Sequence, residues 1–92
     1  MEGRRVDDID ALGQEGDYTL LFSDDGGIHC LWMKLPRTGT QGRIPAVGQG
    51  TGGEPEWTIV ENASGSVTVL PSIDEGNGGY HGFLTDGIWG DG

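Results

Sequence analysis

The stretch from Trp57 to Trp89 constrains the fold most, because it reads as consecutive β-strands separated by turns. Residues 56–61 alternate apolar and polar side chains, and the apolar ones are β-branched or aromatic, as in half-buried strands. Residues 62–66, Asn-Ala-Ser-Gly-Ser, have the composition of a turn. Residues 67–70 then predict the return strand of a hairpin. We expect this strand to end at Pro71, because proline has no amide hydrogen to donate to a neighbouring strand.

A second hairpin follows within the same stretch. Residues 80–85 predict a third strand, whose successive side chains point to opposite faces. Asp86-Gly87 is a dipeptide typical of the two-residue loops that close hairpins. Ile88 and Trp89 then begin a fourth strand. The second half of the chain is therefore predicted to be an antiparallel sheet.

The first half of the chain predicts one short helix and another hairpin. Residues 6–12 carry apolar side chains at helical spacing, with aspartates placed to cap a helix and Gly13 placed to end it. Residues 17–22 and 28–35 each predict a strand. The Ser-Asp-Asp-Gly-Gly run between them predicts the turn.

Residues 36–55 are the least regular part of the sequence, with six glycines and three prolines. We expect a Gly/Pro-rich loop here, within which residues 43–47 are a candidate for a short edge strand. A loop of this length in so small a domain usually either has a function or is disordered.

Length and composition limit the size of the core. A chain of 92 residues forms a single domain, residues 1–92, and has no room for a second core. Only 34% of the residues are hydrophobic, and 19 are glycine, so the core must be small. The sequence therefore predicts a mainly β fold, either a small antiparallel β-sandwich or a partly open barrel, with one short N-terminal helix.

Net charge argues against two classes of partner. The chain has 15 acidic and 5 basic residues, a formal charge of −10, and no Lys or Arg follows Arg43. Phosphate backbones and anionic membrane surfaces repel such a chain, so we expect no binding to nucleic acid or to membranes. Solubility is the simpler explanation of the acidity.

The N-terminal residues lack the apolar segment of a secretory signal peptide. The longest apolar run, residues 30–33, is far too short to span a bilayer. With Cys30 as the only cysteine, no internal disulfide can form. We therefore expect a protein that is made in a cytoplasm and is not secreted.

The residue pattern predicts no catalytic residues, no metal site and no cofactor. His29 and Cys30 are neighbours on a strand and point to opposite faces, so they cannot easily form a nucleophile–base pair, and His81 lies on another strand. One cysteine and two histidines fall short of the four ligands of a zinc site. Residues 48–53 fit G-x-G-x-x-G, but Glu-Pro-Glu follows instead of a helix, so we reject a phosphate-binding loop.

Aromatic residues are the strongest candidates for a contact surface. Core packing is the simpler explanation for any single ring, but two or three rings fill so small a core, and the others are then free to anchor a partner. The loop over residues 36–55 adds two arginines, and a histidine lies between aromatic residues of the third strand. The candidate partner-binding residues are Trp32, Arg37, Arg43, Tyr80, His81 and Trp89.

Three segments carry a resemblance: residues 56–59 (Glu-Trp-Thr-Ile), 67–73 (Val-Thr-Val-Leu-Pro-Ser-Ile) and 80–87 (Tyr-His-Gly-Phe-Leu-Thr-Asp-Gly). In this order and spacing they resemble a family of small β-rich domains of unknown function that is common in bacteriophage genomes. The resemblance implies a β fold and a bacteriophage context. The family's cysteines imply a zinc site near the first hairpin and before the third-strand histidine. This chain has Asp-Asp-Gly-Gly at residues 24–27 and Tyr80 before that histidine, so the implied zinc cysteines are missing.

Three functions are compatible with these features. The leading hypothesis is a non-enzymatic bacteriophage accessory protein that docks on a larger assembly as a capsid decoration or minor virion protein. Its partner would be a major capsid protein or another copy of the chain, and its location the virion or the host cytoplasm. The first alternative is an acidic inhibitor of a host factor, with carboxylates in place of nucleic-acid phosphates. The second is a degenerate zinc-binding domain.

Overall fold

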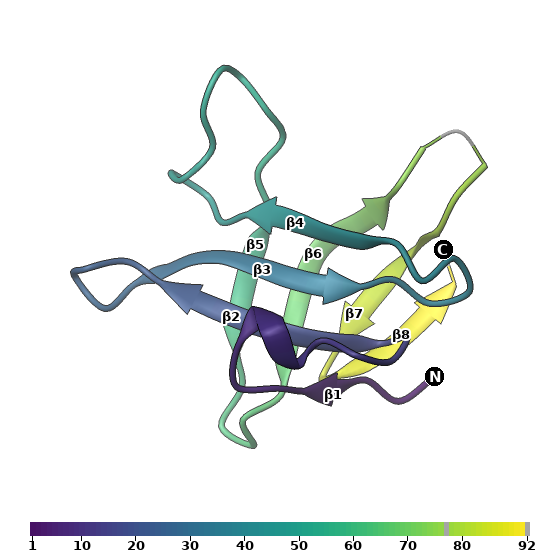
Figure 1. Cartoon of the computed structure of the whole chain (residues 1–92). Helices are drawn as coiled ribbons and strands as arrows, with labels where there is room; N and C mark the ends of the chain where they lie inside the picture. The colour runs from purple at the N-terminus through teal and green to yellow at the C-terminus, as the bar shows by residue number, and fades with distance from the viewer. Residues whose placement is uncertain (77, 92) are drawn as a thin grey trace.

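The computed structural model describes residues 1–76 and 78–91, which form two four-stranded β-sheets (Figure 1). Each sheet comes from one contiguous part of the chain. The first sheet contains β1 (Arg4–Arg5), β2 (Asp17–Phe22), β3 (Ile28–Lys34) and β4 (Gln41–Pro45). The second contains β5 (Thr58–Glu61), β6 (Val67–Asp74), β7 (His81–Thr85) and β8 (Ile88–Asp91). The prediction of a mainly β protein is therefore confirmed.

Strands follow each other in chain order within both sheets. In the first sheet β1 pairs with β2 in parallel, whereas β2–β3 and β3–β4 are antiparallel. All pairs of the second sheet are antiparallel. The Asp86-Gly87 loop joins β7 to β8 as predicted, with φ of 51° and 76° at its two residues. Positive φ at both central residues is the geometry of the turns that close two-residue hairpins.

β6 does not end at Pro71, so that prediction is wrong. The strand continues to Asp74, and the pairing register between β6 and β7 shifts between Val69 and Ile73. Proline is tolerated in a strand at such an irregularity, because its missing amide hydrogen falls where regular pairing is interrupted. The strand consequently bends and remains paired on both sides of the proline.

Inward-facing side chains of both sheets meet in a shared hydrophobic core. Trp57 and Ile28 are partly buried against it. Isolated bridges connect the sheets at Ala46–Trp57 and at Glu2–Ile88, but the sheets are not closed into a barrel. In Figure 1 the strands of the first sheet cross those of the second. The buried core residues are Tyr18, Leu20, Leu31, Met33, Leu35, Ile44, Ala46, Ile59, Val67, Val69, Ile73, Tyr80, Leu84 and Trp89.

The predicted helix over residues 6–12 is not confirmed. The structure has a single 3-10 turn over Ile9–Ala11, capped by the side chain of Asp8. Val6 instead donates its amide hydrogen to the carbonyl oxygen of Tyr18 and so extends the pairing with β2. A segment this short cannot offset the cost of starting an α-helix, so the contacts with the sheet decide its conformation.

The Gly/Pro-rich region is less irregular than predicted. β4 lies inside the expected loop of residues 36–55 and begins at Gln41, two residues before the candidate strand of residues 43–47. It forms the edge of the first sheet beside β3. Between the bridged residues Ala46 and Trp57, residues 47–56 form a loop that projects from the body of the molecule (Figure 1).

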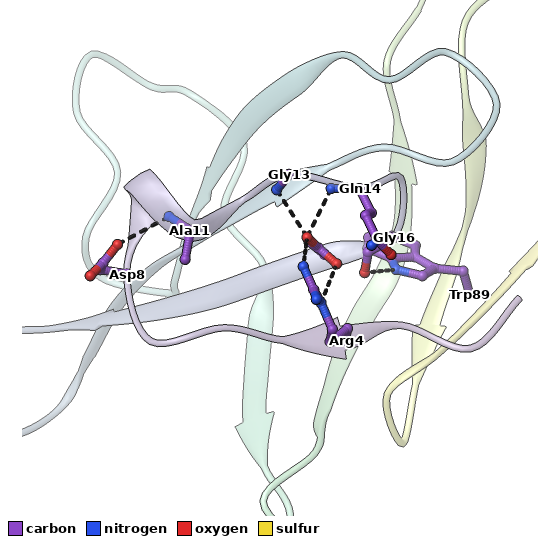
Figure 2. A network of polar contacts seen from close by, with 8 residues as sticks. Arg4, Asp8, Ala11, Gly13, Gln14, Gly16 and Trp89 are labelled. Atoms are coloured by element: carbon purple, nitrogen blue, oxygen red, sulfur yellow. Dashed lines mark hydrogen bonds and ion pairs between the residues drawn. The ribbon is translucent and has the colours of Figure 1, made fainter.

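A buried carboxylate anchors the N-terminal segment. The Arg4 side chain and the amides of Gly13 and Gln14 converge on the carboxylate of Asp17, whose side chain is 1% exposed (Figure 2). The Arg4 hydrogen bonds, more than its positive charge alone, lower the pKa of Asp17 from 3.8 to about 2, against the opposing effect of burial. These contacts tie β1 and the connector that follows the 3-10 turn to the first residue of β2.

Candidate functional site

The outer face of the second sheet carries a row of exposed apolar side chains, one from each strand. Val60, Leu70, Phe83 and Ile88 are 44%, 52%, 39% and 54% exposed. We call these four residues the apolar stripe. Single exposed apolar residues are ordinary in proteins, but contiguous ones on one face are a feature of contact surfaces.

Side-chain alternation explains why these residues point outward. On β5 and β6, Ile59 and Val69 face each other on the inner side and are buried, so their neighbours Val60 and Leu70 face solvent. Leu84 on β7 is likewise buried, which puts Phe83 on the outside.

Strand register makes the stripe continuous. Val60 lies opposite Thr68, so Leu70, two residues further along β6, is its diagonal neighbour. Phe83 lies opposite Gly90, so Ile88 is its diagonal neighbour on β8. Val69 lies opposite Leu84, which places Leu70 and Phe83 on neighbouring strands in the middle of the row. Diagonal neighbours on one face of a sheet are within reach of long side chains, so the stripe is a bent row across all four strands, with Val60 and Ile88 at its two ends.

Most positions around the stripe are uncharged, but the exposed Glu2 lies opposite Ile88 in an isolated bridge and therefore on the same face. Thr58 lies opposite Leu70, Thr85 lies opposite Ile88, and Thr68 and Gly90 complete the outward-facing positions beside it. Other charged groups of the described residues lie where the sheet ends. At one end Asp74 pairs with His81, and at the other Asp86 occupies the β7–β8 loop. With Glu2 at its β8 edge, this face carries little charge for a chain whose formal charge is −10.

Hydrogen bonds fix the Asp86 end of this face. The hydroxyl oxygen of Thr68 accepts a hydrogen bond from the Asn62 side chain at 3.0 Å and from the Asp86 amide at 2.9 Å. These bonds connect the β5–β6 turn to the β7–β8 loop, so the face is held in one shape.

The outer face of the first sheet differs, because the N-terminal segment covers part of it. Thr19 and Cys30, which lie on that side of β2 and β3, are 2% and 1% exposed. Leu12, which follows the 3-10 turn, is also buried, and the turn lies over this sheet in Figure 1.

Three of the six predicted partner-binding residues, Arg37, Tyr80 and Trp89, lie together beside β7 and β8. The rings of Tyr80 and Trp89 pack edge to face with centroids 5.7 Å apart, and the Arg37 guanidinium lies 5.3 Å from the Tyr80 ring centroid. Arg37 also pairs with Asp91 at 3.6 Å, but both side chains are largely exposed, so this ion pair contributes little to stability. A hollow of about 330 Å³ here is lined by Met1, Pro36, Arg37, Tyr80, Trp89, Gly90 and Asp91.

The structure places the Tyr80 and Trp89 rings in the core. They are 1% and 3% exposed, and each uses its polar atom inside the protein. The Trp89 indole donates a hydrogen bond to the Gly16 carbonyl oxygen at 2.9 Å (Figure 2), and the Tyr80 hydroxyl donates one to the Gly90 carbonyl oxygen at 3.2 Å. Burial raises the pKa of the Tyr80 hydroxyl. Both rings belong to the core and are not available to anchor a partner.

Trp32 and Arg43 lie opposite each other on β3 and β4, away from the second sheet. Trp32 is half-buried, and Arg43 is exposed and lies 3.9 Å from a carboxylate oxygen of Glu54. His81 is the one predicted residue beside the apolar stripe. Its Nε2 lies 3.1 Å from the Ser72 hydroxyl. The six predicted residues therefore occupy three separate places.

Catalytic chemistry finds little support in this arrangement. The Ser72–His81 pair resembles a nucleophile and its base, but within the described residues no acidic side chain holds the other ring nitrogen of His81. Burial raises the pKa of Cys30, so its thiol is kept from forming the reactive thiolate. Among residues 1–76 and 78–91, no three His, Cys, Asp or Glu side chains are grouped so that they could hold a metal ion.

The apolar stripe was not predicted from the sequence. Alternation puts Val60 and Leu70 on the face opposite Ile59 and Val69, but it does not say which of the two faces is the core. The aromatic candidates Tyr80 and Trp89 are instead part of the core.

Comparison of the chain with models of protein families, with curated proteins and with solved structures finds no match. In the described part of the chain, no helix has the length and apolar character needed to cross a membrane.

Proposed function

We propose that this protein is a non-enzymatic accessory protein that acts as a bound component of a larger protein assembly. The observation that carries the proposal is the apolar stripe, an exposed and uncharged row on an otherwise acidic molecule. The two sheets around a shared core, a small β-sandwich, provide a rigid support for such a contact surface.

Energetics support a contact at this face. Complete burial of a Val, Leu, Ile or Phe side chain stabilises a protein by about 1.5–3 kcal/mol, so each half-exposed stripe residue can still gain about 1 kcal/mol from a partner. Four such residues on one rigid face can together gain roughly 4 kcal/mol per molecule. The surrounding threonines can form the polar rim that protein interfaces commonly have.

A bacteriophage particle is the assembly that we propose, as a capsid decoration or minor virion protein. The support is the sequence resemblance over residues 56–89, which contains all four stripe residues. The corresponding locations are the virion and the host cytoplasm. The acidic inhibitor and the degenerate zinc-binding domain have no comparable observation in their favour.

Particle composition tests this function. Particles purified on a density gradient are analysed by mass spectrometry for the wild-type chain, for Leu70→Glu and for Val47→Glu. Leu70→Glu places a charge in the stripe, whereas Val47, which is 63% exposed, receives the same charge in the projecting loop. We expect wild type and Val47→Glu in the particles and a loss of Leu70→Glu. Absence of the wild-type chain, or equal retention of both variants, contradicts the proposal.

A further inference from the structure

We infer that the free edge of β4 binds an extended segment of another protein, which adds to the first sheet as a further strand and inserts a large apolar side chain beside Gly42. The segment carries a Lys or Arg two positions from that apolar residue. The site lies on the first sheet, so the inference goes beyond the proposed function and does not depend on the apolar stripe.

The backbone of β4 has groups free to pair with such a segment. At residues 41–44 no other described segment pairs with the outer side of this strand. Ala46 donates its amide hydrogen to the His29 carbonyl oxygen at 3.1 Å. Because hydrogen-bonded pairs alternate along antiparallel strands, Gln41 and Arg43 turn their amide and carbonyl groups away from β3. These are the groups with which a peptide pairs when it adds a strand to a sheet.

A cleft of about 200 Å³ opens beside this edge and reaches the core. Gly42 faces inward, since it lies opposite the buried Met33, but it has no side chain to fill the space. The only described atom within 4 Å of a Cβ at this position would be the Met33 Cε, at 3.9 Å. Glycine inside a strand often marks a place where another backbone or a ligand approaches closely. The apolar side chains that line the cleft belong to Met33, Leu35, Ile44, Trp57 and Ile73.

The cleft has the size and position of a site for one side chain. Pockets that hold whole small molecules typically measure about 300–1,000 Å³, which is more than this cleft offers. On an added strand, the residue opposite Gly42 points to the same side of the sheet as Gly42, so its side chain enters the cleft. The Trp57 ring is a fixed wall, because its indole donates a hydrogen bond to the Ser72 carbonyl oxygen at 3.0 Å.

Charge at the rim of the cleft favours a basic segment. Asp74, Glu75 and Arg43 are the charged residues that line it. Glu54 lies 3.9 Å from the Arg43 guanidinium and opposes its charge. Among the described residues, no Lys or Arg forms an ion pair with Asp74 or Glu75. The rim is therefore acidic, and it complements a positive charge on the partner.

Alternation fixes where that positive charge belongs. Thr40 lines the same cleft and lies two residues before Gly42, so both are on one side of the chain. Beside it, the Thr38 hydroxyl donates a hydrogen bond to Glu75 Oε1 at 3.1 Å. A residue of the added strand opposite Thr40 therefore lies near the Glu75 carboxylate. It is two positions from the apolar residue opposite Gly42, which gives the pattern of the inference.

NMR titration with synthetic peptides tests the site. The probe is Thr-Lys-Thr-Leu-Thr-Lys-Thr, in which a lysine lies two positions from leucine on both sides, so either strand direction presents the pattern. We expect a dissociation constant below about 1 mM for the probe. Replacing its leucine by alanine, or both lysines by glutamate, is expected to weaken binding at least tenfold. Higher salt is expected to weaken binding of the probe, because it screens the attraction to the acidic rim.

Hydrogen exchange reports whether the probe adds a strand. The amide hydrogens of Gln41 and Arg43 are expected to exchange at least tenfold more slowly with saturating probe, because they then bond the added strand. The amide of Asp24, in the exposed turn between β2 and β3, is the control and is expected to exchange at an unchanged rate.

Filling the cleft from inside the protein tests where the leucine goes. Gly42→Leu occupies the space beside β4 and is expected to weaken binding of the probe at least tenfold. Gly90→Leu makes the same change on β8, where a Cβ meets no described atom within 4 Å, and is expected to bind like wild type. Circular dichroism establishes whether both variants are folded.

Each outcome decides the inference. Failure of the probe to bind at about 1 mM overturns it. Equal binding of the leucine and alanine peptides, unchanged exchange at Gln41 and Arg43, or full binding by Gly42→Leu also overturns it. If Gly42→Leu does not fold, the comparison of the leucine and alanine peptides on the wild-type chain decides. None of these results depends on whether the protein is found in purified particles, so the proposed function stands or falls separately.

Discussion

Replacing Asp17 by asparagine removes the charge of a buried carboxylate without changing its size. The oxygens of Asp17 accept hydrogen bonds from the Arg4 guanidinium at 2.8 and 3.1 Å. One of them also accepts hydrogen bonds from the amides of Gly13 and Gln14 at 3.0 and 2.9 Å. An asparagine has only one acceptor oxygen, and its NH2 group would face donors. The variant therefore takes the charged acceptor away from donors of three residues, Arg4, Gly13 and Gln14.

The pKa of Asp17 gives the size of the effect. It falls from 3.8 to about 2 on folding, first because of the Arg4 hydrogen bonds. Since one pKa unit corresponds to about 1.4 kcal/mol, the charged form stabilises the fold by roughly 2 kcal/mol. A lowered carboxyl pKa means that this contribution is fully present above pH 3.8 and is lost as the pH falls through about 2. We expect Asp17→Asn to lose about 2 kcal/mol at neutral pH and to approach wild type in acid.

Urea unfolding followed by tryptophan fluorescence, repeated from neutral to acidic pH, measures this difference. For a chain of this size a loss of about 2 kcal/mol corresponds to a fall in Tm of roughly 10 °C. Asp24→Asn makes the same change of charge at an exposed position and is expected to stay within about 0.5 kcal/mol of wild type. The reasoning is refuted if Asp17→Asn is as stable as wild type at neutral pH. It is also refuted if the difference stays constant down to pH 2.

Two matched pairs of variants test the packing around β7 and β8 by thermal unfolding. Gly82→Ala is expected to lower the free energy of unfolding by about 1–3 kcal/mol or more, because its methyl group would overlap the Tyr80 hydroxyl and the Gly90 carbonyl oxygen. Gly90→Ala is expected to lower it by less than about 1 kcal/mol, because its methyl group meets no described atom within 4 Å. Equal losses would show that the space at Gly82 does not matter. Trp89→Phe removes the indole donor to the Gly16 carbonyl oxygen and part of the core, so the free energy of unfolding is expected to fall by about 2–4 kcal/mol. Trp32→Phe changes a half-buried ring and is expected to lower it by about 1 kcal/mol or less. A Trp89→Phe variant that unfolds like Trp32→Phe contradicts the core position of this ring.

The hairpins were predictable because local chemistry determines them. Asp86-Gly87 adopts the positive φ angles for which these residue types are suited, and the turn over residues 62–66 lies where its composition placed it. The predicted helix over residues 6–12 does not form, because this segment gains more from its hydrogen bond to β2 than from an amphipathic helix with three apolar residues. β4 was predicted only as a candidate edge strand over residues 43–47, because glycine and proline weaken a strand signal, although the edge of a sheet accepts Pro45.

The candidate site was harder to predict than the strands. On β6 and β7 the inward residues Val69 and Leu84 each adjoin an outward apolar residue, so the sequence does not say which side the core occupies. The buried Trp89 indole donates a hydrogen bond to Gly16, a residue far away in the chain, and no local sequence pattern predicts that hydrogen bond. Exposure of the stripe thus depends on how the two sheets meet, which only the folded structure provides.

Each sheet is made from one uninterrupted half of the chain, yet the core needs both. A backbone cut at residues 50–53 would break no strand pairing. Each of the two resulting fragments would contain all the strands of one sheet, and the apolar inner face of each sheet is covered by the other. We therefore expect the two fragments to regain the fold together, which is the property that a split reporter needs.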